Sequence, residues 1–298
     1  MAIIISICNQ KGGVGKTTTS VNLAACLAAA EKRTLLLDLD PQANATTGVG
    51  FNKSEIKRSS YQALIGKDSI ESSVLKTEMN YLSLVPSQSA LVGAELELVG
   101  IVSRETRLKN CIKPIINQYD YIIIDCPPSL GLLTLNALTA TNYVIIPVQC
   151  EYYAMEGLAD LKRTIYLVKQ RLNPSLEIKG IVLTMFDSRN NLAHQVSEEL
   201  RKHFNEVVFN VVIPRNVRLS EAPSYGKPII LYDVKSKGAQ SYFELAKEVL
   251  KQDFEVLTQK EENYASKESA GEGTGFVDPA GDGGTPLGEE PASGRSVD

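Results

Sequence analysis

The most constraining feature of this sequence is the glycine-rich segment NQKGGVGKTT at residues 9–18. It follows an apolar, β-branched run at residues 3–8 and precedes a helical pattern at residues 18–30, which is the strand–loop–helix context of a phosphate-binding loop. Glycines allow backbone N–H groups to approach phosphate oxygens closely, and the helix N-terminus adds partial positive charge at the same point. We expect the phosphates to be bound by Lys11, Gly12, Gly13, Val14, Gly15, Lys16, Thr17 and Thr18.

Two lysines and a threonine in this segment carry distinct chemistry. Lys16 can reach the β- and γ-phosphates of a nucleoside triphosphate, and the Thr17 hydroxyl can ligate Mg²⁺. The general pattern G-x-x-x-x-G-K-S/T would place its first glycine at position 10, but Gln10 stands there and a second lysine, Lys11, follows it. This departure resembles the deviant Walker A motif, whose signature lysine crosses a dimer interface to the partner's nucleotide. A glycine-rich turn with an incidental lysine is the alternative interpretation.

Three aspartates stand where apolar runs end. Asp38 and Asp40 follow the run at residues 34–37, and Asp125 follows the run at residues 121–124. The carboxyl ends of parallel strands form the edge at which open α/β sheets bind ligands. An acid at the end of an apolar strand is typical of a Walker B carboxylate, which holds Mg²⁺ directly or through water. A helix cap or a turn residue is the competing interpretation for each of them.

The remaining apolar runs predict the order of the fold. Strands are expected at residues 3–8, 34–37, 81–85, 121–124, 143–148, 178–184 and 207–211. Helical patterns occupy residues 18–30, 104–117, 132–139, 155–172, 192–204 and 240–257. Continuous hydrophobicity suits parallel strands that are covered on both faces. The alternation therefore predicts an α/β fold of the P-loop NTPase class, with a doubly wound, mostly parallel sheet and helices on both faces.

Composition separates a folded body from a tail. The net charge is -4, but residues 258–298 hold nine acids and three bases, so the rest of the chain is mildly basic. The end of the chain is rich in Gly, Ser, Glu and Pro and poor in aliphatic residues, which favours disorder. We expect an ATPase domain at residues 1–257 and a disordered acidic tail at residues 258–298. The N-terminus has no basic stretch before its apolar residues, and the five cysteines form no CxxC pair, so the cytoplasm is the expected compartment.

Beyond the loop, the sequence resembles the ParA/Soj partition ATPases of the ParA/MinD superfamily, from residue 1 to about residue 253. The resemblance rests on DLDPQANAT at residues 38–46, DCPPSL at 125–130, LTMFDSR at 183–189 and IPRNVRLSEAPSYGKP at 213–228. The last two segments are specific to this subfamily. The resemblance implies an ATP-hydrolysing homodimer that sandwiches ATP and Mg²⁺ and binds double-stranded DNA without sequence preference. It also implies a ParB-type partner that stimulates hydrolysis, nucleoid association, and a role in chromosome or plasmid segregation.

The same resemblance implies roles for individual residues. Asp40 would position or activate the attacking water and form the catalytic set with Lys11 and Lys16. Asp38 would support the Mg²⁺ shell, together with Thr17 and Asp125. The adenine would be bound by Pro214 and Asn216, and DNA would be contacted by Arg189 and Arg218. A solvated surface side chain is the alternative for each arginine.

Two other functions compete with this interpretation. A membrane-associated positioning ATPase similar to MinD would need a basic or apolar amphipathic helix at the C-terminus, whereas this end is acidic and Gly-rich. An iron–sulfur carrier would need cluster cysteines, and Cys126 beside Asp125 is the only tempting candidate. His194 and His203 lie in one helical pattern without neighbouring metal ligands, and we interpret both as structural or surface residues.

Overall fold

An eight-stranded sheet forms the centre of the computed structural model, which describes residues 1–151, 154–204 and 207–271. The strand order is β3-β4-β2-β5-β1-β6-β7-β8, and every neighbouring pair is parallel except β3 and β4. The strands are β1 (Ile3–Ile7), β2 (Thr34–Asp38), β3 (Leu75–Lys76), β4 (Leu82–Val85), β5 (Tyr121–Asp125), β6 (Tyr143–Gln149), β7 (Glu177–Phe186) and β8 (Val208–Pro214).

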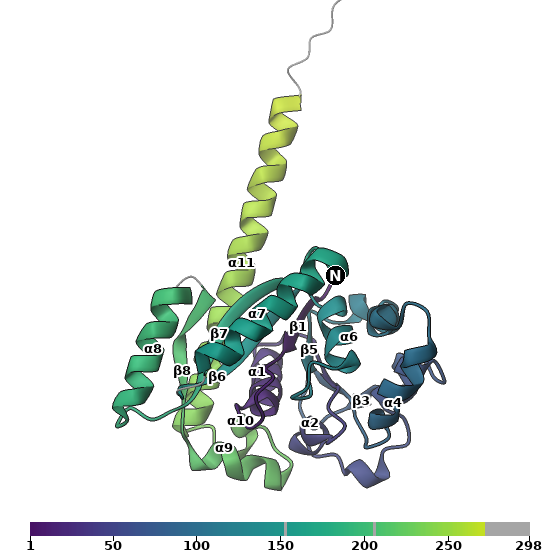
Figure 1. The fold of residues 1–298 in the computed structure, drawn as a ribbon, viewed down its shortest axis with the longest axis horizontal. Coiled ribbons are helices and arrows are strands. Elements are labelled where there is room, and N and C mark those ends of the chain that lie inside the picture. Colours follow the sequence, from purple (N-terminus) through teal and green to yellow (C-terminus); the bar gives the residue numbers. More distant parts are fainter. Residues whose placement is uncertain (152–153, 205–206, 272–298) are drawn as a thin grey trace, which may run out of the picture. The chain divides into compact units, whose positions relative to one another are not determined.

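Helices connect these strands and also follow the last of them (Figure 1). They are α1 (Lys16–Ala29), α2 (Asn44–Gly48), α3 (Ser60–Ile65), α4 (Leu91–Glu97), α5 (Arg107–Ile112), α6 (Leu132–Ala140), α7 (Ala154–Arg171), α8 (Asn191–Phe204), α9 (Val217–Glu221), α10 (Ile229–Tyr232) and α11 (Lys237–Gly271). The chain divides into two compact units, Met1–Lys251 and Gln252–Asp298. No helix within the described ranges is long and apolar enough to cross a membrane.

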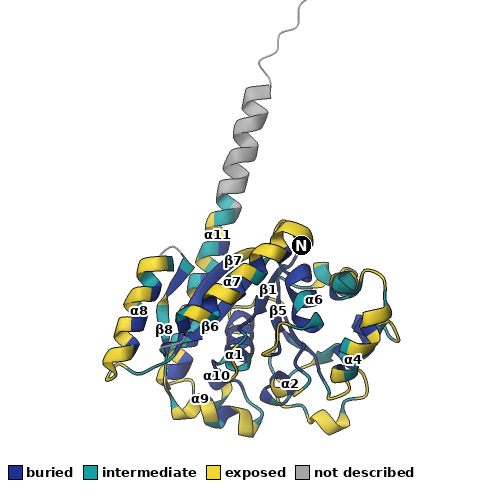
Figure 2. Cartoon of the chain, viewed as in Figure 1, coloured by how far each residue is buried: buried dark blue, intermediate teal, exposed yellow. Residues whose placement is uncertain are grey.

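Two apolar cores lie on opposite faces of the sheet, because successive side chains of a strand point to opposite sides. In β1, Ile4 packs into the core that holds α3 to α8, whereas Ile5 packs into the core that holds α1, α10 and the first turns of α11. Figure 2 shows the strands and the inward helix faces as buried, with exposed residues on the outer faces. The predicted doubly wound α/β class is therefore confirmed.

Some predicted helices and strands differ from those of the structure. The helix predicted at residues 104–117 is interrupted: α5 ends at Ile112, two residues before Pro114, whose ring cannot continue a helix. The edge strand β3 and the short helices α2, α3, α4, α9 and α10 were not expected. Helix α11 was predicted to end at residue 257 but continues to Gly271, through a stretch rich in the good helix formers Lys, Glu and Ala. The rest of the predicted disordered tail, residues 272–298, lies outside the described residues, and the domain division at residue 257 stays a prediction.

The strand order creates a switch point at the carboxyl end of β1. This strand lies between β5 and β6, and the chain builds the sheet outward in opposite directions from it. Loops that leave neighbouring strands toward opposite faces open a crevice at that edge, which is where α/β sheets bind ligands. Asp38 and Asp125, directly opposite each other in the β2–β5 register, end their strands at the same edge.

Candidate functional site

The glycine-rich loop leaves β1 and turns into α1. Gly13 and Gly15 have φ of 74° and 85°, and Gly15 caps α1 in the left-handed region that disfavours side chains. Side-chain hydrogen bonds connect the loop to β6 and β7. The Thr184 hydroxyl donates to the Val14 carbonyl (2.8 Å), and the Asn9 amide donates to the Pro147 carbonyl (2.7 Å). The loop is therefore held in its cradle shape by the sheet.

Lys16 begins α1 at the bottom of this cradle. The residue is 7% exposed, and its Nζ donates to the Lys11 carbonyl at 3.0 Å. Burial lowers the pKa of the Lys16 ammonium, and the nearby Asp125 carboxyl partly opposes this effect. A desolvated ammonium beside exposed loop amides is suited to an anionic ligand such as a phosphate.

Asp125 is fully buried at the end of β5. Its Oδ1 accepts a hydrogen bond from the Ser20 hydroxyl (2.8 Å), whereas its buried Oδ2 has no hydrogen-bond partner among the described residues. Burial raises the pKa of Asp125 to about 8, with a further upward contribution from Asp38 and an opposing effect of the neighbouring Ser20 and Thr17 hydroxyls. A buried carboxylate oxygen without a partner, next to a threonine hydroxyl, fits a hydrated Mg²⁺ ion.

The Asp38 carboxylate accepts hydrogen bonds from the segment that follows β2. Its Oδ1 accepts from the Asp40 amide (3.1 Å), and its Oδ2 accepts from the Thr46 amide and hydroxyl (2.8 and 2.7 Å). Burial raises the pKa of Asp38 to about 7, against these hydrogen bonds. Asp38 therefore fixes the segment that runs from β2 into α2. Asp40, in the same segment, accepts from the Gln42 amide (2.9 Å).

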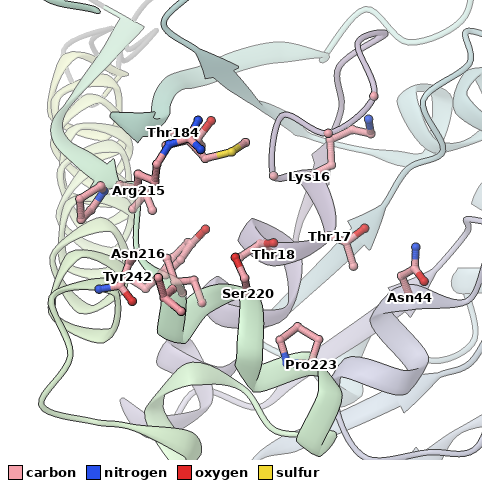
Figure 3. Close-up of a pocket in the computed structure, with 18 of the residues that line it drawn as sticks. Lys16, Thr17, Thr18, Asn44, Thr184, Arg215, Asn216, Ser220, Pro223 and Tyr242 are labelled. Carbon is pink, nitrogen blue, oxygen red and sulfur yellow. The ribbon is translucent and has the colours of Figure 1, made fainter. Parts of the chain in front are cut away.

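These elements enclose a cavity of about 690 Å³. Figure 3 shows Lys16 and Thr17 on one side of it and Arg215, Asn216 and Tyr242 on the other. The expected phosphate-binding residues that line it are Gly12, Gly13, Gly15, Lys16, Thr17 and Thr18. Asp40, Pro214 and Asn216 line it as well. A single cavity thus brings together the residues expected at the phosphates, at the attacking water and at the base.

Lys11 is placed differently from the other lysine of its loop. Its side chain is 43% exposed and forms an ion pair with Glu151, while its backbone amide donates to Asn9 Oδ1 (3.0 Å). It is not among the described residues that line the cavity. The two lysines of the loop are therefore segregated, with Lys16 inside the cavity and Lys11 outside it.

The two arginines expected at DNA lie on separate elements near the same sheet edge. Arg189, in the loop after β7, has an 86% exposed side chain that forms a bidentate pair with Asp187 (3.0 and 2.9 Å). Arg218, on α9, has a 55% exposed side chain that pairs with Glu221 at 2.9 Å. Neither side chain lines the nucleotide-sized cavity in the described part of the chain.

Several supporting residues were missed from the sequence. Ser20 lies one helical turn after Lys16 and reaches Asp125, a spacing that would have placed it on the inner face of α1. Thr46 binds the Asp38 carboxylate from eight residues further along the chain. Thr184 binds the glycine-rich loop from 170 residues away, so no local sequence pattern indicates the contact. Tyr242, buried on α11, lines the cavity and contacts the Thr19 hydroxyl (3.2 Å).

Cys126 and the two histidines, considered above as metal or cluster ligands, contact other protein groups. The Cys126 thiol lies 3.0 Å from the Cys8 thiol, and both residues are buried. His194 Nε2 lies 2.9 Å from the Ser188 carbonyl, and His203 lies 3.2 Å from Glu199. Within the described ranges, no group of three or more His, Cys, Asp or Glu residues could hold a metal ion by itself. A Mg²⁺ ion in this cavity would therefore depend on the threonine hydroxyl, water and substrate as well as the carboxylates.

The loop, the buried lysine and the strand-end carboxylates define a P-loop nucleotide hydrolase. Residues 2–178 match a protein family described as an AAA domain. A "Chromosome partitioning protein ParA" from Myxococcus xanthus is 60% identical over 84% of this chain and 88% of its own length. A "Sporulation initiation inhibitor protein Soj" from Bacillus subtilis is 57% identical over 84% and 98%. The chain therefore belongs to the ParA/Soj family of partitioning ATPases, and it is an ATPase.

Solved structures share the fold. The cobyrinic acid a,c-diamide synthase from Mycobacterium smegmatis, solved with ADP and magnesium, has a TM-score of 0.74 at 36% identity, over 84% of this chain and 94% of that one. The cell division ATPase MinD from Pyrococcus furiosus has a TM-score of 0.71 at 26% identity, over 85% and 100%. The fold therefore extends to proteins with different names, so function must be argued from the site and from the close relatives.

Proposed function

We propose that the chain is an ATP-driven switch for chromosome or plasmid partition. ATP binding brings two copies into a sandwich dimer, the dimer binds double-stranded DNA of any sequence, and hydrolysis stimulated by a ParB-type protein releases it. The observation that carries the proposal is the segregation of the two lysines: Lys16 faces its own cavity, whereas Lys11 lies outside it with a half-exposed side chain.

Within one protomer, the cavity residues divide the work on ATP. The loop amides and Lys16 bind the phosphates, and Thr17 and Asp125 would hold Mg²⁺, which would offset phosphate charge. Asp38 supports this shell indirectly by fixing the segment that carries Asp40. Asp40 orients the attacking water, since it lines the cavity. Its remaining oxygen is available, because the Gln42 amide bonds only Oδ1.

The far side of the cavity suits the base. Pro214 and Asn216 line it together with Tyr242 and Arg215. Figure 3 shows Asn216 across the cavity from Lys16 and Thr17. On the phosphate side, Val14 contributes its backbone amide, and its carbonyl is held by the Thr184 hydroxyl. We assign Pro214 and Asn216 to adenine contacts.

Lys11 completes the site in the dimer. Its half-exposed ammonium, outside its own cavity, is placed to approach a phosphate that a second copy brings to it. Binding of that lysine to the partner's ATP would make dimerisation depend on the triphosphate. A switch of this kind requires the DNA-competent state to be favoured by ATP through differential affinity, which a shared lysine supplies.

DNA binding is assigned to Arg189 and Arg218. Both side chains are exposed at the edge of the sheet that carries the nucleotide cavity. Dimerisation doubles the contacts available to one duplex and so raises avidity without new chemistry. Phosphate contacts carry no sequence information, so the complex would be nonspecific and nucleoid-associated in the cytoplasm.

The test is a salt titration of DNA affinity with ATP present. Each lost phosphate contact should flatten the slope of log affinity against log salt by about 0.9. Arg218→Ala should weaken binding to all DNA sequences alike, and Lys247→Ala, which removes a cation from an exposed ion pair on α11, is the control of matched charge. Equal slopes and affinities for wild type and Arg218→Ala would remove Arg218 from the interface. Strong DNA binding by nucleotide-free protein would contradict the switch.

A further inference from the structure

Both arginines assigned to DNA are already paired with acids of their own chain. Arg189 uses Nε and Nη2 on the two carboxylate oxygens of Asp187, at 3.0 and 2.9 Å. A bidentate pair of this kind occupies one of the edges of the guanidinium fork that can bind a phosphate. Two of the five guanidinium donors of Arg189 are therefore engaged before any DNA arrives.

Arg218 is held between two acids. Its Nη1 donates to Glu221 Oε2 at 2.9 Å, and its Nε lies 3.5 Å from Asp233 Oδ2. The same Glu221 oxygen accepts from the Tyr232 hydroxyl at 3.0 Å, which fixes the carboxylate in place. The contacts with Arg218 and Tyr232 lower the pKa of Glu221, so it stays charged at neutral pH.

Asp187 and Glu221 make few structural contacts besides these ion pairs. Asp187 also accepts from the Arg189 amide (3.1 Å), which closes a local turn that an asparagine oxygen can close as well. Glu221 ends α9, and a glutamine would keep its acceptor oxygen. The charges of both carboxylates can therefore be removed while the local hydrogen bonds are kept.

We infer that Asp187 and Glu221, with Asp233 beside them, act as internal competitors for DNA phosphates and thereby set the affinity of the ATP-bound protein. The inference rests on the proposed function, because it assumes that Arg189 and Arg218 contact DNA. A phosphate that takes these donors displaces a carboxylate, and one that binds the remaining donors is repelled by the carboxylate charge, so each contact yields less affinity than a free arginine would. Weak individual contacts allow the protein to leave DNA readily once the dimer separates.

The expected size follows from the strength of exposed ion pairs. Breaking one such pair costs the complex roughly a two- to five-fold loss in affinity. Two protomers contribute one copy of each pair, so Glu221→Gln should raise DNA affinity by about 4- to 25-fold. The salt slope should stay unchanged, because the same number of phosphates is contacted.

The experiment compares four variants of the full chain with ATP and Mg²⁺, using fluorescein-labelled DNA of random sequence. Glu221→Gln and Asp187→Asn should shift the salt titration to higher affinity in parallel with wild type. Glu244→Gln, which removes an acid from an exposed pair with Lys247 (2.6 Å), should leave affinity within about two-fold of wild type and so controls for net charge. Circular dichroism melts of each variant establish that the fold is kept.

The outcomes separate the inference from the proposed function. If Arg218→Ala weakens binding while Glu221→Gln and Asp187→Asn leave it unchanged, the acids are not competitors and the inference is overturned alone. If Glu244→Gln raises affinity as much as Glu221→Gln, the effect is net charge and the inference is equally overturned. If Arg218→Ala has no effect, the DNA assignment itself is wrong and the inference goes with it.

Discussion

The buried carboxyl of Asp125 makes the stability of the ligand-free protein depend on pH. Its pKa is raised to about 8, whereas an unfolded chain releases this proton near pH 3.9. Between these values the folded state binds one more proton than the unfolded state, so the free energy of unfolding falls as pH rises. The slope for one carboxyl is about 1.4 kcal/mol per pH unit and ends near pH 8.

Asp125→Asn should remove this share of the slope. The asparagine keeps an oxygen for the Ser20 hydroxyl and carries no titratable proton. Without Mg²⁺, the free energy of unfolding of wild type should fall relative to the variant by about 3 kcal/mol between pH 5 and pH 7. That is a large part of the stability of a typical domain. Asp38, whose pKa is raised to about 7, contributes in the same direction.

The assay is urea denaturation followed by circular dichroism, at pH 5, 6, 7 and 8 in a chelating buffer. Groups that titrate equally in both proteins do not affect the difference between the two curves. Adding Mg²⁺ with a nonhydrolysable ATP analogue should stabilise wild type more as pH rises, because the ionised carboxylate binds the cation. Parallel curves for wild type and Asp125→Asn would refute a neutral, buried Asp125.

Three further substitutions probe the nucleotide cycle. Lys16→Ala should lower ATP affinity by at least about tenfold, since it removes a charged phosphate contact, and unchanged affinity in calorimetry would contradict the phosphate role. Asp40→Ala should bind Mg·ATP but hydrolyse it about 10²- to 10⁴-fold more slowly, so that an ATP-dependent dimer accumulates in light scattering; wild-type turnover would exclude Asp40 from catalysis. Lys11→Ala should keep measurable nucleotide binding but lose ATP-dependent dimerisation, and a variant that still dimerises would rule out the cross-interface role.

The sequence predicted the parts of this protein that depend on local pattern. Parallel strands that are buried on both faces need continuous hydrophobicity. The apolar runs before Asn9, Asp38 and Asp125 could therefore be recognised as strands. The glycine-rich loop was evident because its φ angles demand glycine at positions such as 13 and 15. These local requirements leave a mark in the residues themselves, so they can be recognised before folding.

Contacts between distant segments could not be predicted in this way. Thr184 reaches the loop across 170 residues of chain, and Tyr242 reaches Thr19 across 223. The ion pair of Lys11 with Glu151 and the acids around Arg218 are likewise invisible to periodicity, because they depend on which loops share the sheet edge. The continuation of α11 beyond residue 257 was missed because composition was interpreted as disorder, although its residues favour helix.

The short segment after β8 connects the nucleotide cavity to α9. Asn216 lines the nucleotide cavity, and its side-chain oxygen caps α9 by accepting from the Arg218 amide at 2.9 Å. Under the proposed function, the adenine contact and the DNA contact are thus joined by one hydrogen bond. A substitution of Asn216 that alters the nucleotide contact would therefore also remove the cap that positions Arg218. A chimera that exchanges residues 213–228 whole should therefore work where a piecemeal graft fails.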